Sequence, residues 1–119
     1  MEKLRKWHVV YTKPKWEKKV DLNFAQKGIE SWCPTQKKER QWSDRKKIIE
    51  EPLFKSYVFV KATKEEYNNV LSTMGVVRFL YFEKKPAIIR DNEIELIRKY
   101  LGLSYTNIQV VDMGAIKPQ

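Results

Sequence analysis

The segment from Asp91 to Leu101, DNEIELIRKYL, constrains the fold more than any other part of this chain. It begins with acidic and ends with basic residues, as the helix dipole favours, so we expect a helix with Asp91 as its N-cap and Gly102 as its end. Ile94, Ile97 and Leu101 form an apolar stripe that must be buried against another apolar surface. The fold therefore needs a sheet face that this helix can cover.

The rest of the chain is expected to form two β-α-β units. They are separated by a charged segment, residues 35–50, which we call the charged excursion. Runs of β-branched and aromatic residues predict strands, and a four-residue apolar period and the capping-box pair Thr63 and Glu66 predict helices. The expected strands are residues 7–12, 29–33, 56–62 and 76–82, the expected helices are residues 15–27 and 63–72, and residues 84–86 are an expected loop. Residues 35–50 carry a turn signal at Ser43-Asp44 and indicate a protruding hairpin or a mobile loop. This order predicts an α+β fold with a mostly antiparallel β-sheet flanked by helices on both faces.

The aromatic strand of residues 57–60, Tyr-Val-Phe-Val, supports two hypotheses. Preceded by Lys55, it approximates the signature of an RNA-recognition module, which stacks single-stranded RNA bases on exposed aromatics. Against this, Ser56 replaces the glycine of that signature, and the last helix is expected to cover the same face. The other hypothesis is a pocket that receives another protein. Tyr57 could belong to the core or to the pocket, whereas we expect Phe54 to be exposed.

Charge and composition limit the kinds of partner and of functional site that this chain can have. The net charge is +9, and residues 1–50 hold 14 Lys and Arg against 7 Asp and Glu, which favours a nucleic-acid or acidic protein partner. A single cysteine, Cys33, excludes an internal disulfide and a Cys-rich zinc site, and four glycines leave no glycine-rich phosphate loop. We expect no enzyme activity, no cofactor, no metal and no membrane span, and a cytoplasmic protein. His8 and Cys33 are expected to be structural.

Five segments in register resemble the N-terminal domain of NusG-type transcription elongation factors. They are Trp7-His-Val-Val-Tyr11, the charged excursion, Glu51-Pro-Leu-Phe54 with Tyr57-Val-Phe-Val60, Gly75-Val-Val-Arg-Phe79 and Pro86-Ala-Ile-Ile89. The resemblance covers residues 6–101 and is strongest to specialised paralogues of the RfaH and UpxY kind, which antiterminate particular operons. It implies a ferredoxin-like arrangement in a domain of residues 1–102. Residues 103–119 would be a linker toward a KOW domain that the sequence lacks.

The resemblance also implies partners and site residues. The domain would be a monomer that binds the clamp helices of the bacterial RNA polymerase β′ subunit and bridges to the β subunit, so that pausing falls. The implied clamp-binding depression consists of Tyr11, Pro52, Leu53, Phe54 and Phe59, with Ile94 and Ile97 at its rim. The implied contacts to the polymerase β gate loop are Glu66, Tyr67 and Asn68.

A last implied site contacts the non-template DNA strand. Its residues are Lys13, Trp16, Lys19, Thr73 and Met74. Lysines could meet phosphates and Trp16 could stack a base. Trp16 is also four residues before Val20, on the apolar face of the predicted helix, so a core position remains the alternative. Met74 stands where the family often has an arginine.

Overall fold

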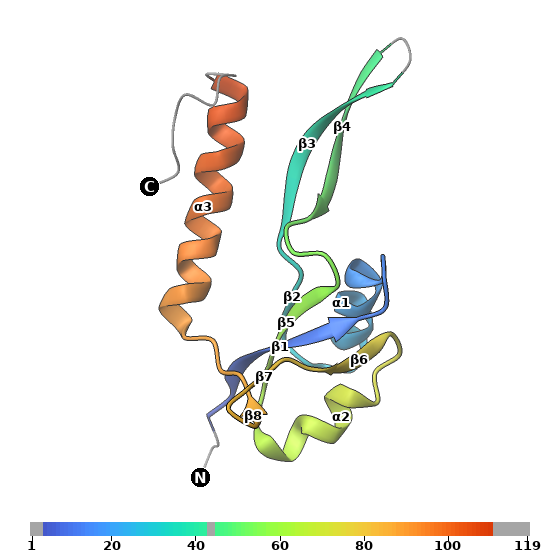
Figure 1. The fold of residues 1–119 in the computed structure, drawn as a ribbon, viewed down its shortest axis with the longest axis vertical. Helices are drawn as coiled ribbons and strands as arrows, with labels where there is room; N and C mark the ends of the chain where they lie inside the picture. The colour runs from blue at the N-terminus through green and yellow to red at the C-terminus, as the bar shows by residue number, and fades with distance from the viewer. Residues whose placement is uncertain (1–3, 43–44, 111–119) are drawn as a thin grey trace.

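The computed structural model describes residues 4–42 and 45–110. Its centre is a four-stranded antiparallel sheet in the order β2-β5-β1-β6 (Figure 1). The strands are β1 (Lys6–Thr12), β2 (Ser31–Trp32), β5 (Tyr57–Ala62) and β6 (Val76–Phe79). The helices are α1 (Glu17–Gln26), the short turn η1 (Lys64–Glu66) with α2 (Tyr67–Leu71), and α3 (Asp91–Val110). The predicted α+β architecture is confirmed.

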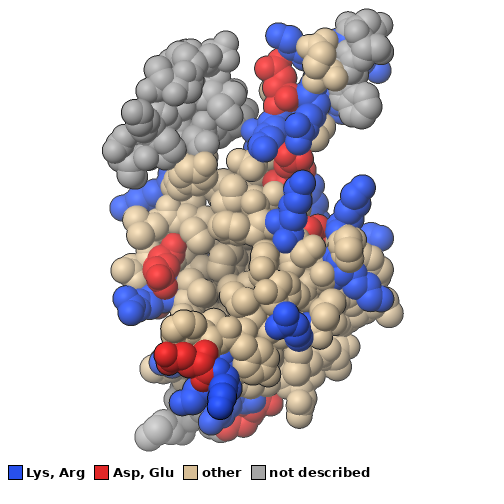
Figure 2. Space-filling model, in the orientation of Figure 1, with Lys and Arg blue, Asp and Glu red and all other residues tan. Residues whose placement is uncertain are grey.

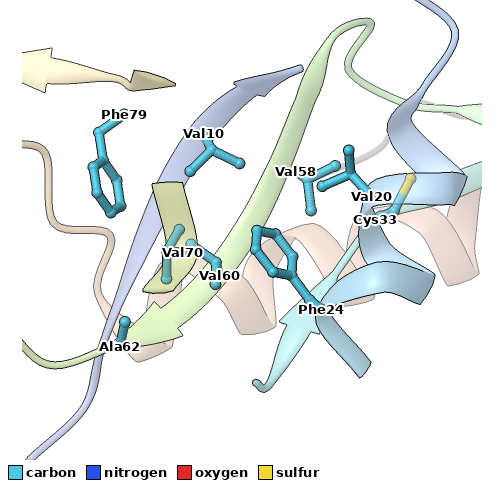
Figure 3. Packing of buried hydrophobic residues seen from close by; sticks show 9 residues of the cluster. All are labelled: Val10, Val20, Phe24, Cys33, Val58, Val60, Ala62, Val70 and Phe79. Carbon is cyan, nitrogen blue, oxygen red and sulfur yellow. The ribbon is translucent and has the colours of Figure 1, made fainter. Parts of the chain in front are cut away.

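The two faces of the sheet bury two separate apolar clusters. Val58 and Val60 of β5 point to the face that α1 and α2 cover, where they meet Phe24 and Val70 (Figure 3). The opposite face buries Trp7, Val9 and Phe59 under Ile94 of α3, with Ile97 packed at the side. Alternation along each strand produces both clusters, because successive side chains of a strand point to opposite faces. The prediction that the apolar stripe of the last helix covers this second face is confirmed for Ile94 and Ile97.

The charged excursion is a two-stranded ribbon that stands out from the sheet (Figure 1). It consists of β3 (Thr35–Trp42) and β4 (Arg45–Pro52), paired so that Lys38 faces Ile49 and Arg40 faces Lys47. The predicted hairpin is confirmed, whereas its turn at Ser43-Asp44 lies outside the described residues. α3 runs on the same side of the sheet as this ribbon and contacts β3.

The expected strand over residues 76–82 is wrong, because it breaks at Leu80. The Leu80 N–H donates to Val9 O at 2.8 Å, while the Leu80 carbonyl accepts the N–H of Ala87 at 2.8 Å. The chain therefore changes partner at this residue. β7 (Tyr81–Phe82) pairs with β8 (Lys85–Pro86), so residues 85 and 86 are a strand rather than a loop. Glu83 and Lys84 make the turn with positive φ angles of 52° and 66°.

Three helix boundaries also differ from expectation. Gly102 does not end α3, which continues to Val110, so the expected domain boundary at residue 102 falls inside a helix. Asp91 is the first helical residue rather than the N-cap, and the N–H of Arg90 is satisfied by the Glu93 carboxylate at 2.8 Å. α1 begins at Glu17 rather than Lys15, because Lys15 has a φ of 65°, which a right-handed helix cannot contain.

Candidate functional site

A row of aromatic rings crosses the sheet face that α3 leaves partly open. We call it the aromatic patch; its members are Tyr11, Trp32, Phe54, Tyr57 and Phe59. The strand register places Tyr11 opposite Tyr57, and their ring centroids are 4.7 Å apart. It also places Trp32 opposite Phe59, whose rings stack at 5.8 Å. Phe54 follows β4 and meets Phe59 edge-on at 5.9 Å. Three strands and one turn therefore assemble a single apolar surface.

Two arginines lie over the aromatic patch at its opposite ends. The guanidinium of Arg78, from β6, is 4.3 Å from the centroid of Tyr11, and that of Arg98, from α3, is 4.5 Å from Trp32. Such contacts leave the cationic groups in water while their planar faces cover the rings. A hydrogen bond with Tyr11 raises the pKa of Tyr57, with burial adding to the effect, so Tyr57 is neutral at physiological pH. The patch is apolar at its centre and cationic at its ends.

Exposure separates the residues that can meet a partner from those that cannot. Phe54 is 37% exposed, and Phe59 is 6% exposed beneath it. Most of the remaining residues of the region are half-buried; they are Tyr11, Trp32, Pro52, Leu53, Tyr57 and Ile97. Ile94 is only 2% exposed, so its expected position at the rim is wrong: its side chain points into the core with Trp7 and Val9. The covered Phe59 also argues against an open aromatic platform for stacking RNA bases.

Backbone hydrogen bonds fix the turn that carries Phe54. The N–H of Leu53 donates to Pro34 O at 2.7 Å, and the carbonyl of Ser56 accepts the N–H of Thr12 at 2.9 Å. Ser56 has a φ of 66°, the left-handed conformation that glycine adopts most easily. The turn is therefore attached to the structure on both sides of Phe54. This presents the phenyl ring on a constrained backbone.

The expected DNA-contacting residues gather where β1 ends and α1 begins. Trp16 is half-buried, and the ammonium groups of Lys13 and Lys19 lie 5.5 and 4.8 Å from the centroid of its ring. Gly75 lies against the indole: a Cβ there would sit 2.6 Å from Trp16 Cε3. Trp16 thus packs one side against the core and holds two cations beside its ring. Figure 2 shows basic side chains along the hairpin and on the side where α1 lies, whereas the middle of that view is mostly uncharged.

The other two residues expected to touch DNA differ from each other. Met74 is 69% exposed and is available to a ligand. Thr73 is 3% exposed, and its hydroxyl donates to Asn69 O and accepts from the ammonium of Lys27, both at 3.0 Å. Thr73 therefore joins α2 to α1, and its side chain is not placed to contact a nucleic acid.

The three residues expected at the gate loop also have unequal access. Asn68 is exposed, whereas Tyr67 packs against the cluster under α1 and α2 and its hydroxyl lies 3.2 Å from His8 Nε2. Glu66 accepts the N–H of Thr63 at 2.9 Å, which confirms the capping box, and forms an ion pair with Arg5 at 2.6 Å. Asn68 is thus the member of this group that is most available to a partner.

The ion pair of Glu66 predicts a specific acid dependence of stability. Hydrogen bonds from Arg5 and from the Thr63 amide lower the pKa of Glu66 from 4.5 to about 2. Because the folded pKa is the lower one, the stabilisation is fully present above about pH 4.5 and is lost as the pH falls toward about 2. We expect Glu66→Gln to be less stable than the unaltered chain near neutral pH, with the difference vanishing across this range. Urea unfolding at a series of pH values measures it, and a difference that stays constant with pH would contradict the assignment.

Comparison with known families identifies the chain. Residues 5–98 match the family described as "Transcription termination factor nusG". The chain belongs to the NusG family. Among solved structures, a NusG from Thermotoga maritima, described as "Domain interaction in Thermotoga maritima NusG", matches with a TM-score of 0.54 and 29% sequence identity. The match covers 83% of this chain and 58% of the Thermotoga chain. A search of curated proteins finds no significant match.

NusG-type proteins are transcription factors. In this domain burial shifts the pKa of two residues, His8 and Cys33. His8 is buried, its Nδ1 lies 2.8 Å from Ala87 O, and burial lowers its pKa. Burial raises the pKa of the Cys33 thiol to about 11, so it is a poor nucleophile at neutral pH. Both residues are structural, as predicted. Within the described part of the chain, no group of His, Cys, Asp and Glu is placed to hold a metal ion, and no helix is long and apolar enough to cross a membrane.

Sequence reasoning missed four residues of this NusG domain's candidate site. Trp32 was hidden in a short expected strand, although its alternation with Cys33 indicates that the two point to opposite faces. Arg78 and Arg98 reach the patch only through the sheet register and the docking of α3, for which the local sequence has no signal. In the sequence, Glu17 has the position of an ordinary acidic residue in a first helical turn, which is usually exposed. In the structure its side chain is buried.

Proposed function

We propose that this NusG domain binds the clamp helices of the bacterial RNA polymerase β′ subunit through the aromatic patch, with Pro52, Leu53 and Ile97 at its border. The observation that carries the proposal is Phe54, an exposed phenyl ring on a constrained turn above a floor of stacked aromatics. Amphipathic helices dock on grooves through a few apolar anchors ringed by polar groups. Arg78 and Arg98 supply such polar groups at the two ends.

We propose two further contacts for this domain, one with the polymerase β subunit and one with DNA. Asn68, at the start of α2, contacts the polymerase β gate loop, with Glu66 and Tyr67 supporting it. Lys13, Trp16, Lys19 and Met74 contact the non-template DNA strand. Bridging the two polymerase subunits holds the clamp closed and suppresses pausing and termination, in the manner of the RfaH and UpxY paralogues that act on particular operons. The domain acts as a cytoplasmic monomer, and the chain after it leads toward a KOW domain.

Competition with purified bacterial RNA polymerase tests the clamp contact. The tagged domain should capture the polymerase, and an isolated clamp-helix fragment should displace it by occupying the aromatic patch. Single-stranded RNA of the same molar concentration serves as the matched competitor for the alternative function. Displacement by RNA but not by the clamp-helix fragment would refute the proposal.

Salt dependence tests the DNA contact. Binding of a labelled single-stranded DNA should weaken as salt rises, because each neutralised phosphate releases counterions, with a logarithmic slope of roughly −0.7 per contact. If both lysines meet phosphates, Lys13→Ala with Lys19→Ala should reduce the magnitude of the slope by about 1.4. Lys84→Ala with Lys85→Ala, on the distant β7–β8 hairpin, is the charge-matched control. A slope that both pairs change equally would show that only the overall charge matters.

A further inference from the structure

A buried carboxylate connects the start of α1 to the turn that carries Phe54. Glu17 is the first residue of α1, and its side chain is 6% exposed, although glutamate is usually exposed on protein surfaces. Its Oε2 accepts the backbone N–H of Ser56 at 2.6 Å. The two residues are 39 positions apart in the sequence. The hydrogen bond is therefore a tertiary link and no part of the helix's own capping.

The backbone of Ser56 needs such support. A residue with a Cβ is strained in the left-handed region and keeps that conformation only when its surroundings hold it. Ser56 has a φ of 66°. Its carbonyl is held by the Thr12 N–H at 2.9 Å and its N–H by Glu17. The side chain of Glu17 thus supplies one of the two hydrogen bonds that hold this backbone conformation.

We infer that Glu17 is a positioning residue for Phe54. By holding Ser56, it keeps the turn in one conformation, so that little conformational freedom is lost when Phe54 docks on a partner. This inference rests on the proposed function, in which Phe54 contacts the polymerase. Glu17 need not touch the polymerase, because its carboxylate is buried behind the turn.

Three substitutions at Glu17 separate this role from a general effect on α1. Glu17→Ala removes the acceptor. Glu17→Asp keeps a negative charge at the helix start but is one methylene shorter, so it does not reach the Ser56 N–H. Glu17→Gln keeps an acceptor oxygen at the same reach. A role limited to the helix dipole would make the aspartate variant behave like the unaltered chain, since only the charge matters there.

The polymerase affinity of each variant gives the first readout. Removing a hydrogen bond to a charged group is expected to weaken binding about tenfold in the alanine and aspartate variants. The glutamine variant should retain most of the affinity. In a Phe54→Ala background the same substitutions should change affinity less than about twofold, because Glu17 acts through the turn of Phe54. An equal loss in both backgrounds, or an unchanged affinity of the aspartate variant, would overturn the inference.

Hydrogen exchange of the Ser56 amide gives a second readout that does not depend on the polymerase. The amide should be protected in the unaltered chain and in Glu17→Gln, and should exchange at least about tenfold faster in Glu17→Asp. Unchanged exchange in Glu17→Asp would refute the positioning role even if the polymerase binds. If the unaltered chain does not bind the polymerase but the exchange result is as expected, the proposed function fails while the link from Glu17 to the turn stands.

Discussion

Phe54→Ala is expected to lower the affinity for bacterial RNA polymerase about thirtyfold or more, while the domain stays folded. The ring is 37% exposed, and its aromatic contact is the edge-on one with Phe59. Little of the core is lost when it is removed. Aromatic anchors at the centre of an interface commonly contribute about 2 kcal/mol or more, which corresponds to about thirtyfold in affinity.

Phe82→Ala is the matched control for this experiment. Phe82 is also a surface phenylalanine, 68% exposed, but it belongs to β7 and lies outside the aromatic patch. Its truncation should leave the affinity unchanged. Affinities from a titration of labelled domain with polymerase, together with thermal unfolding of each variant, distinguish a lost contact from a lost fold. Equal affinity of Phe54→Ala and the unaltered chain would remove Phe54 from the interface.

Ile94→Ala is expected to lower the free energy of unfolding by about 3 kcal/mol. Ile94 is 2% exposed and packs against Trp7, Val9 and Phe59, so alanine leaves a cavity between α3 and the sheet. Because α3 covers this face through few buried side chains, the loss should also loosen the helix over Phe59. Polymerase affinity should therefore fall as well, although Ile94 itself makes no outside contact.

Leu96→Ala provides the comparison on the same helix. Leu96 is 60% exposed and lies two residues further along α3. Its substitution should change the unfolding free energy by less than about 0.5 kcal/mol, as surface changes usually do. Urea unfolding of both variants gives the two values directly. If Leu96→Ala and Ile94→Ala lower the free energy of unfolding by similar amounts, α3 does not dock through Ile94.

The fold could be predicted from the sequence wherever local patterns and burial agree. The stripe of Ile94 and Ile97 required a sheet face to cover, and the pair Thr63 and Glu66 marked a helix start; both are present. The prediction that α3 ends at Gly102 is wrong, because the cost of glycine inside a helix, about 1 kcal/mol, is small enough for neighbouring residues to offset. The break at Leu80 has no local signal at all. It depends on hydrogen bonds to Val9 and Ala87, which only the folded sheet brings together.

The candidate site was less predictable than the fold, for a related reason. Sequence patterns distinguish apolar from polar faces, and so they place Tyr11 and Phe59 on the free sheet face and predict an exposed Phe54. The grouping of these residues into one depression with Ile94 at its rim is what the family resemblance implies, and Ile94 is buried instead. Sequence patterns also do not reveal contacts between distant segments, such as Arg98 over Trp32.

The close fit of Gly75 against Trp16 restricts how this protein can diverge. With a φ of 95° and the indole so near, position 75 has room for hydrogen alone. A Cβ there would meet Val20 Cγ2 at 2.7 Å as well as the indole, and its positive φ would strain any other residue even in open space. Lineages descending from this sequence should therefore keep glycine at position 75, and Trp16 can keep its seat beside Lys13 and Lys19 only while they do.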